Sequence, residues 1–254
     1  MASALQPIMQ EVKRAIFRLP GAGRRLIPPY SPMLETDQLI WLCDAVDRTR
    51  AAATGGCIVE VGVARARTSS FLLAHMREHG DKRPYYCIDT LQGFTASDVA
   101  YEVEQRGKPA GALTGFAVND RDLIELGLRR QGFDNVVVVE ADAGAFDWSK
   151  LPPIDVLLVD VDLYKPSKAV LAASQAFWSH VARVMVYDMR SDTAFDGAHQ
   201  AYMEFCAERR YSPRLVGTKS GVILPSEQTV PPEEVVGDMR EAPVLVSPPF
   251  QSVS

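Results

Sequence analysis

Short apolar runs alternate with segments of helical period along most of this chain, and that alternation restricts the fold more than any other feature. The apolar runs are rich in β-branched residues and carry little charge, which is typical of strands covered on both faces. The segments between them place apolar residues at helical spacing. Strands are therefore predicted at 57–63, 84–90, 135–142, 154–162 and 182–189, and the helices between them at 68–80, 119–132 and 166–181.

A further helix is predicted at 194–210, followed by two short segments, 214–218 and 221–225, that are close enough to form an antiparallel hairpin. Strands that alternate with helices predict a mainly parallel sheet with helices on both faces. The expected fold class is α/β, with a Rossmann-like sheet of seven strands and a C-terminal antiparallel hairpin. The hairpin argues against a plain dinucleotide-binding fold.

The same patterns of apolar runs and helical periods divide the chain into three parts. Residues 1–54 are expected to form a helical lid or oligomerisation segment, with an amphipathic helix over 5–17 and a second helix that begins at an N-cap, Thr36. Residues 55–225 form the α/β domain, in which 91–118 has no strong periodicity and is interpreted as a lid. The proline-rich tail, 226–254, is expected to be disordered or laid on a neighbouring surface.

Composition excludes several classes of partner. The net charge is -5 and the basic residues are scattered, which disfavours binding to nucleic acid or to an anionic membrane. The N-terminus mixes charge into its apolar pattern, unlike a signal peptide, and no apolar run approaches the length of a membrane span. The four cysteines are widely spaced, so neither a zinc site nor a disulfide framework is expected. We expect a cytoplasmic protein.

Polar residues at the ends of the first two strands suit a nucleotide-like cofactor. Glu60 and Gly62 stand where the first strand turns into a helix, and a glycine there lets a ligand approach the backbone and the helix N-terminus. Asp89 ends the second strand, where a carboxylate can accept hydrogen bonds from the hydroxyls of a ribose. The turn lacks G-x-G-x-x-G, which disfavours a nicotinamide or flavin dinucleotide. Each residue alone also suits an ordinary turn or a helix cap.

The later strands end in further acidic residues. Asp142 or the backbone of Ala143, after the third strand, is a candidate to reach the amino group of an adenine, and the alternative is that Asp142 is a solvated loop residue. Asp160 and Asp188 close the fourth and fifth strands, and two carboxylates that converge on one crevice can hold Mg²⁺ or another hard divalent cation. Asp162 is either a further ligand or points to the opposite face, because side chains alternate along a strand. The competing interpretation is that these aspartates cap helices.

Taken together, these segments resemble the macrocin O-methyltransferase family of class I, S-adenosylmethionine-dependent methyltransferases. The resemblance covers roughly residues 36–224 and lies in EVGVARARTSS, in IDTLQGFTASDVAYEVEQRGK, in GFDNVVVVEADAGAF, in DVDLYKPSKAVL and in the DGAHQAYMEF helix. It implies a seven-stranded sheet, S-adenosylmethionine as the methyl donor, dependence on Mg²⁺, and a homodimer or higher homo-oligomer. The implied substrate is a hydroxyl group of a small molecule, a sugar or a natural-product scaffold.

The resemblance also implies roles for particular residues. Asp160 is implied as a metal ligand and the general base, Asp188 as a second ligand, and His199 as an assistant in deprotonation. Met189 stands where the family shows a second Asp, and the usual Pro-Gly-Gly turn before the fifth strand is absent, so a third oxygen ligand would come from Asp162, Asp192 or water. The implied cofactor-binding residues are Glu60, Gly62, Ala64, Ser69, Asp89, Thr90, Asp142, Ala143 and Asp160.

Two other functions remain open at this point. The substitution at Met189 favours a protein that binds S-adenosylmethionine without methylating anything and acts as a partner subunit. An oxidoreductase that uses a dinucleotide or a nucleotide sugar is disfavoured, because the chain lacks both G-x-G-x-x-G and a plausible Tyr-Lys or Cys catalytic pair.

Within the predicted lid, three aromatic residues are expected to offer an apolar wall to the substrate, unless they only pack the loop. These residues are Phe94, Tyr101 and Phe116.

Overall fold

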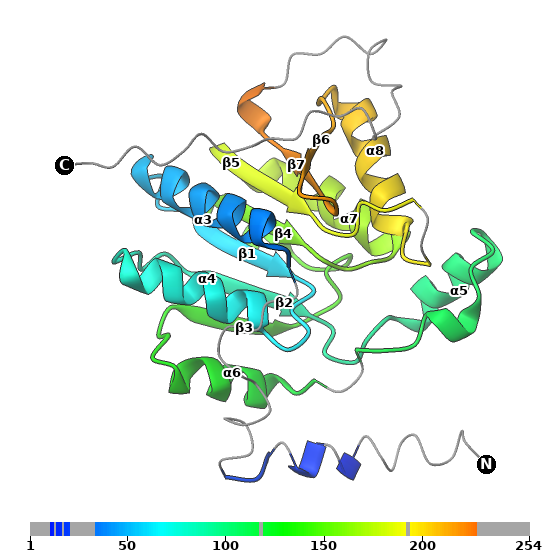
Figure 1. The fold of residues 1–254 in the computed structure, drawn as a ribbon, viewed down its shortest axis with the longest axis horizontal. Helices are drawn as coiled ribbons and strands as arrows, with labels where there is room; N and C mark the ends of the chain where they lie inside the picture. The colour runs from blue at the N-terminus through cyan, green and yellow to red at the C-terminus, as the bar shows by residue number, and fades with distance from the viewer. Residues whose placement is uncertain are drawn as a thin grey trace.

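Seven strands form one sheet in the order β3-β2-β1-β4-β5-β7-β6 (Figure 1). The computed structural model describes residues 11–20 without 13 and 17, and residues 34–227 without 117, 118, 192 and 193. Five strands pair in parallel and β7 runs antiparallel to both β5 and β6. The predicted fold class and its closing hairpin are confirmed. The strands are β1 (Cys57–Val61), β2 (Tyr85–Asp89), β3 (Val136–Glu140), β4 (Ile154–Val159), β5 (Trp178–Val186), β6 (Arg214–Val216) and β7 (Ser220–Ile223).

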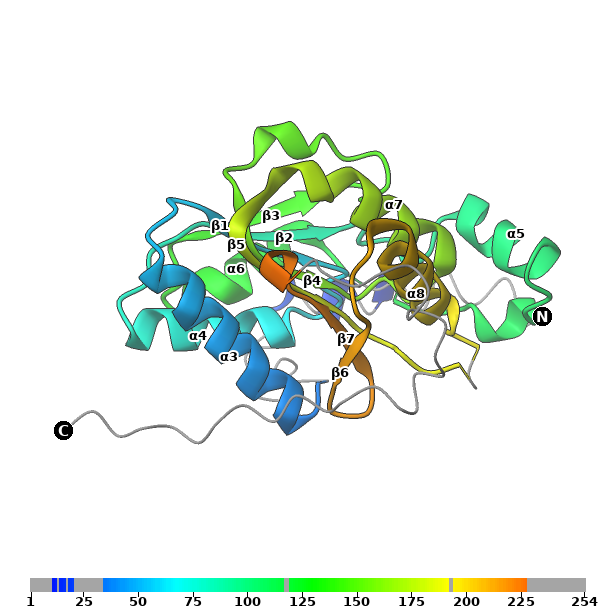
Figure 2. The same ribbon diagram turned by 90° about the horizontal axis from the view of Figure 1, so that it is seen from above.

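Both faces of the sheet are covered by helices, as the apolar strand sequences require. One face packs against α3 (Thr36–Ala51), α4 (Arg67–Glu78) and α6 (Arg121–Arg130). The other packs against α7 (Tyr164–Ser174) and α8 (Gly197–Arg209). Figure 2 shows α3 and α4 on the side of the sheet opposite to α7. Every residue of β1 and of β4 is buried, so these two central strands form the middle of the core.

Helix α3 belongs to this core, although the sequence analysis set 1–54 apart from the α/β domain. Its residues Trp41, Leu42, Ala45 and Val46 are buried in the cluster that includes Ile58 of β1. Outside α3, the described part of 1–54 is helical at 11, 12, 14–16 and 18, within the predicted first helix or just beyond it. The tail lies outside the described residues from 228 onward.

Helix starts and one strand boundary differ from prediction by a few residues. The N-cap of α3 is Glu35, which forms a capping box with Gln38, rather than Thr36. The N-cap of α6 is Asp120, whose side chain accepts a hydrogen bond from the Leu123 backbone, so this helix begins two residues after its predicted start at 119. Strand β5 begins at Trp178, inside the segment predicted as helix, because Trp178 pairs with Ile154 of β4. Periodicity could not reveal a pairing with a strand twenty-four residues away, since it reports only local sequence.

The predicted lid contains a helix, α5 (Ala96–Glu104), and a short 3-10 turn, Ala110–Ala112. In both views α5 stands apart from the sheet, beyond the ends of the central strands (Figures 1 and 2). It is tied to the domain by Glu102, which is buried and accepts hydrogen bonds from the Tyr164 backbone and from Arg106. Among the described residues, no helix is long and apolar enough to cross a membrane.

Candidate functional site

A cavity of about 670 Å³ opens at the carboxyl ends of the parallel strands. In open α/β sheets this edge, where the strand order reverses between β1 and β4, is the usual ligand site. The volume is within the range of pockets that hold small molecules and cofactors. Residues implied from the sequence that line it are Gly62, Ala64, Asp89, Thr90, Asp142, Ala143, Asp160 and Asp188.

Three carboxylates meet on one side of this cavity. Asp160 follows β4 directly, and its backbone N–H donates to the Val61 carbonyl of β1, which continues the parallel ladder by one residue. Asp188 stands two residues beyond β5, and Asp162 two residues beyond Asp160. One carboxylate oxygen from each lies within 4.8 Å of the other two. The group of Asp160, Asp162 and Asp188 is called the aspartate triad below.

The electrostatics of the triad indicate that a positive charge beside the three carboxylates would stabilise their ionised forms. Burial raises the pKa of Asp160 well above its usual range, and the negative charge of Asp188 adds to the effect. Burial also raises the pKa of Asp162 well above its usual range, followed by the charge of Asp160 and a hydrogen bond with Asp188. Carboxylates in this arrangement either hold protons or share a cation. An all-oxygen set of this kind suits Mg²⁺ or a similarly hard divalent ion.

Backbone geometry explains how Asp162 reaches the triad, which strand alternation left undecided. Asp162 and Asp188 both have left-handed φ angles, 60° and 59°. Aspartate tolerates this conformation better than most residues, because its short polar side chain can bond locally. The turn after each strand therefore redirects the side chain toward the cavity. Asp192, the other carboxylate considered as a ligand, lies outside the described residues.

Met189, the apparent departure from the family pattern, has a structural role. It is 6% exposed and packs in the core cluster between the sheet and helices α7 and α8. Its backbone N–H donates to the Lys219 carbonyl, which fixes the end of β5 to the hairpin. The third carboxylate of the site comes from Asp162 instead.

Gly62 is required by the close approach of two strand ends. Its φ is +84°, and a Cβ atom there would lie 1.8 Å from the backbone oxygen of Asp160. No other residue fits this position without moving β4. The turn that follows leads into α4 and leaves Ala64 on the cavity wall, also with a left-handed φ of 46°.

Asp89 braces the turn after β1. One of its carboxylate oxygens accepts hydrogen bonds from the backbone of Val63 (2.7 Å) and Ala64 (3.0 Å), and the other from Leu91 (2.7 Å). A carboxylate has about four acceptor positions, so three are occupied and about one faces the cavity. The sequence left two roles open for Asp89, a ribose ligand or an ordinary turn or cap residue, and this brace is a role of the second kind.

Glu60 and Ser69 lie beneath the cavity rather than on its wall. Glu60 is 2% exposed and accepts hydrogen bonds from Ser69 Oγ and Tyr85 Oη, both at 2.6 Å. Burial raises the pKa of Glu60 to about 7, although both hydrogen bonds oppose the shift. The pair therefore supports the β1–α4 turn from below, whereas the sequence placed both residues against the cofactor.

The remaining predicted residues are less uniform in position. Asp142 is exposed at the cavity rim and accepts a hydrogen bond from the Gly144 backbone, and Ala143 is buried beside it. Thr90 donates to the Gly93 carbonyl at the base of the lid. His199 is half-buried on α8 and does not line the cavity.

The lid supplies an aromatic wall, but with a different membership from the one predicted. Phe94 and Phe116 line the cavity with their ring centroids 5.6 Å apart, in an edge-to-face arrangement. Tyr101 instead stacks on Tyr164. Its expected place is taken by Phe195, which lies 6.1 Å from Phe94 and comes from the segment before α8.

Two arginines at the start of α4 were not singled out from the sequence. Arg65 and Arg67 line the cavity, Arg65 exposed and Arg67 half-buried. They bring positive charge to the wall of the cavity that the negative triad also lines. The only sequence signal was their place within five residues of Gly62, which is too common a pattern to predict a role.

Comparison with known structures identifies the fold. The O-methyltransferase NovP superposes with a TM-score of 0.58 at 16% identity, covering 86% of this chain and 98% of that chain. CalS11, a calicheamicin methyltransferase, superposes with a TM-score of 0.60 at 19% identity, covering 85% of this chain and 90% of that chain. An apo structure of CalS11, described as a TDP-rhamnose 3'-O-methyltransferase, gives 0.52 at 17% identity, with 85% and 92% covered.

Comparisons with protein-family models and with curated protein sequences give no match. The structural likeness therefore establishes the class I methyltransferase fold for this chain. It does not single out the macrocin O-methyltransferase family.

Proposed function

We propose that this chain is an S-adenosylmethionine-dependent O-methyltransferase that acts on a hydroxyl group of a small molecule. The observation that carries the proposal is the aspartate triad, in a cavity at the carboxyl edge of a methyltransferase-type sheet. The same cavity holds the Gly62 turn and the braced Asp89. Both features are needed together, because the fold alone hosts many activities.

The residues present fit S-adenosylmethionine. The glycine turn leads into the N-terminus of α4, whose first N–H groups suit the carboxylate of the methionine part, with Arg65 and Arg67 nearby. The acceptor position left on Asp89 suits a ribose hydroxyl, and Asp142 with Ala143 borders the place for the adenine. The negative triad is complementary to the positive sulfonium centre.

The residues also fit a hard divalent cation. Asp160, Asp162 and Asp188 would hold Mg²⁺, with water completing its coordination. Such an ion, when bound, supplies positive charge that lowers the pKa of a nearby hydroxyl. The raised pKa values of Asp160 and Asp162 support this assignment, because burial and the neighbouring carboxylates disfavour their charged forms and a bound cation would offset that effect.

The chain's own residues then account for the proton. S-adenosylmethionine supplies a methyl group, whose S–C bond breaks with its electron pair returning to sulfur as an O–C bond forms. Asp160 accepts the hydroxyl proton and releases it to solvent afterwards. Phe94, Phe116 and Phe195 exclude water and hold the substrate for an in-line approach. His199 is the second candidate for the proton, at greater distance from the cavity.

The proposed substrate class is a sugar or a natural-product scaffold, as the resemblance to the macrocin O-methyltransferase family implies. The aromatic wall suits the apolar face of a sugar or a phenol. NovP and CalS11 have the same fold at low identity, and one of them is described as acting on a nucleotide sugar. These points support the class and do not choose a member of it.

The alternative, a protein that binds S-adenosylmethionine without turnover, was favoured by Met189. That support weakens, because Asp162 supplies the carboxylate that Met189 lacks.

An assembly with a second copy remains part of the proposal. The first helical segment exposes Val12 and Ile16, and Leu19 directly after it is also exposed, with 45 to 58% of each surface accessible. Light scattering of the full chain and of a Val12→Ser/Ile16→Ser variant measures whether this segment holds the copies together, and a lower mass for the variant is expected.

The proposal is tested by binding and turnover in one set of proteins. Isothermal titration measures S-adenosylmethionine binding to the wild type, with Mg²⁺ and with a chelator. Formation of S-adenosylhomocysteine is then followed with phenols, free sugars and nucleotide sugars as substrates. We expect binding in both conditions and turnover that needs Mg²⁺ and Asp160. Asp134→Asn, a change of an exposed aspartate far from the triad in sequence, is the matched control.

The outcomes separate the candidates. Turnover that Asp160→Asn abolishes and Asp134→Asn leaves intact supports the metal-dependent enzyme. Binding without turnover of any substrate class supports the partner subunit. No binding of S-adenosylmethionine by the wild type in either condition overturns the central proposal.

A further inference from the structure

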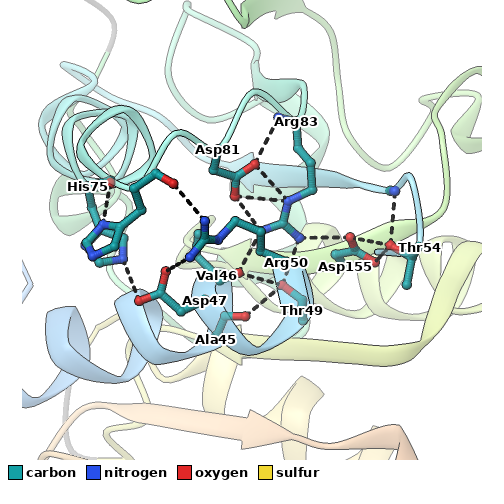
Figure 3. A network of polar contacts seen from close by, with 12 residues as sticks. Ala45, Val46, Asp47, Thr49, Arg50, Thr54, His75, Asp81, Arg83 and Asp155 are labelled. Carbon is teal, nitrogen blue, oxygen red and sulfur yellow. Dashed lines mark hydrogen bonds and ion pairs between the residues drawn. The ribbon is translucent and has the colours of Figure 1, made fainter. Parts of the chain in front are cut away.

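A second group of potential metal ligands lies outside the cavity, on helices α3 and α4. One ligand atom from each of Asp47, His75 and His79 lies within 4.8 Å of the others. His75 and His79 are four residues apart, so they share one face of α4 at its C-terminal end. Asp47 comes from the neighbouring α3, and its Oδ2 lies 3.1 Å from His75 Nε2. Figure 3 shows His75 directed toward Asp47 across the gap between the two helices.

Hydrogen bonding leaves a lone pair available on His79. Its Nδ1 lies 2.9 Å from the backbone oxygen of His75. A carbonyl oxygen only accepts, so Nδ1 carries the proton and Nε2 of the neutral ring has a free lone pair. A backbone carbonyl that fixes a histidine tautomer in this way is the usual support of a metal-binding imidazole.

Asp47 has capacity for a cation as well. Its Oδ1 is buried and accepts no hydrogen bond from the described residues. Arg50 Nη2 lies 3.9 Å from this oxygen and Arg50 Nη1 donates to the His79 carbonyl. Arg50 therefore frames the group from one side, while the exposed His79 leaves the other side open to solvent.

This group is separate from the catalytic cavity. The parallel strands end at the cavity edge, and α4 runs back from there to the amino edge of the sheet. The C-terminal end of α4, which carries His75 and His79, is thus at the opposite edge from the aspartate triad. None of Asp47, His75 and His79 lines the cavity.

We propose that Asp47, His75 and His79 form a binding site for a borderline divalent transition metal ion, for which Zn²⁺ is the probe. Two imidazoles and one carboxylate are the donors that Zn²⁺ prefers, whereas Mg²⁺ prefers oxygen alone. The ion replaces the proton that His75 shares with Asp47, and water completes the coordination on the exposed side. Because the ligands come from two helices, the bound ion links α3 to α4.

The test is a titration of the full-length chain with Zn²⁺ in the presence of excess Mg²⁺, which competes for the all-oxygen triad. We expect one Zn²⁺ site whose affinity falls at least about tenfold in His79→Gln and in His75→Gln, since loss of a direct ligand exceeds loss of an outer partner. His180→Gln, which changes an exposed histidine on β5, is the matched control and keeps the affinity. His79 is exposed, so its variant is expected to fold.

A second measurement reads the link between the helices. Saturating Zn²⁺ is expected to raise the Tm of the wild type by roughly 5 °C and to leave the Tm of His79→Gln within about 1 °C. Asp160→Asn keeps both effects, which separates this site from the triad. Zinc affinity that is unchanged in both histidine variants, or no binding by the wild type, overturns the proposal.

Discussion

Groups of carboxylates that are buried or half-buried occur at both edges of the sheet, and the charge of these carboxylates is balanced differently at the two edges. At the amino edge, Asp155 is fully buried, Asp81 is 6% exposed, and Arg83 donates to both, at 2.9 and 2.7 Å (Figure 3). Thr54 Oγ1 is also within hydrogen-bonding distance of both oxygens of Asp155. At the carboxyl edge, the three carboxylates of the aspartate triad lie together, and burial raises the pKa of Asp160 and of Asp162.

The carboxylates at the two edges therefore have different roles, structural at the amino edge and ligand-binding in our proposal for the carboxyl edge. Where the chain supplies its own cation, the carboxylates hold α3, β2 and β4 together, because Arg83 also donates to Val46 and Thr49 of α3. At the carboxyl edge, the raised pKa values of Asp160 and Asp162 favour protonated carboxyl groups, and such groups can exchange their protons for a ligand. Glu60 is intermediate: it is buried between the two edges, satisfied by hydroxyl groups, and has a pKa of about 7. The predictions below test this contrast in order of expected size.

Arg83→Met should cause the largest loss of stability. It leaves Asp81 and Asp155 buried without their cation, and removal of one partner from a buried ion pair costs about 3–5 kcal/mol. Chemical denaturation measures the free energy of unfolding. Arg129→Met, which breaks an exposed pair with Glu125, is the control and should change it by less than about 0.5 kcal/mol. A loss below about 1 kcal/mol for Arg83→Met would mean that the amino-edge network is not structural.

Asp160→Asn should have the opposite signature. Methyl transfer is expected to fall on the order of a hundredfold to a thousandfold, as for loss of a general base. Stability should stay the same or rise, because one of three mutually repelling groups becomes neutral. Initial rates and denaturation of the same protein measure both. Retained activity with a large loss of stability would show that the carboxyl edge is structural after all.

Glu60→Gln should change how stability depends on pH. The folded pKa of Glu60, about 7, lies above its ordinary value of 4.5, so folding favours the protonated form. The wild type is therefore free of this penalty below pH 4.5 and loses stability as the pH rises toward 7, by about 3 kcal/mol in total. Gln keeps an acceptor for Ser69 and Tyr85 and cannot ionise.

The measurement for this variant compares the free energy of unfolding at two pH values. Unfolding of the wild type and of Glu60→Gln at pH 5 and pH 8 should show the variant gaining relative to the wild type at the higher pH. Glu125→Gln, which neutralises a half-buried glutamate of α6 outside the core, is the matched control for loss of a carboxylate. Parallel pH dependence of wild type and Glu60→Gln would refute the shifted pKa.

Thr54→Val should give the smallest effect. It removes one hydroxyl from Asp155 while Arg83 remains, so a loss of about 1–2 kcal/mol is expected. Denaturation measures it, with Thr218→Val as the control for an exposed hydroxyl near Glu35. A loss as large as that of Arg83→Met would place the compensation of Asp155 in the threonine rather than the arginine.

The fold was largely predictable because its signals are local. Apolar runs and helical periods predicted every strand, and the position of β6 and β7 predicted the antiparallel closure. The start of β5 at Trp178 was missed, since it depends on pairing with a distant strand. The cap at Glu35 differs from the predicted Thr36 by a single residue, within the usual precision of such boundaries.

The site was predictable only where strand geometry determines it. Asp89, Asp160 and Asp188 follow parallel strands, so their convergence at one edge was foreseeable. The position of Asp162 depends on a left-handed backbone angle that the alternation rule does not contain. Glu60 and Phe195 depend on packing depth and loop path, which need the tertiary structure.

The pairing of β1 has a consequence for synthesis on the ribosome. Strand β1 pairs on one side with β2 and on the other with β4, so the half-sheet β3-β2-β1 emerges first with one edge of β1 unpaired. Arg83 emerges with Asp81, but Asp155 follows 72 residues later. At roughly 5–20 residues per second, the nascent chain waits on the order of ten seconds for that carboxylate. During this interval the central strand offers a free edge, and early synthesis is when the chain is most exposed to mispairing.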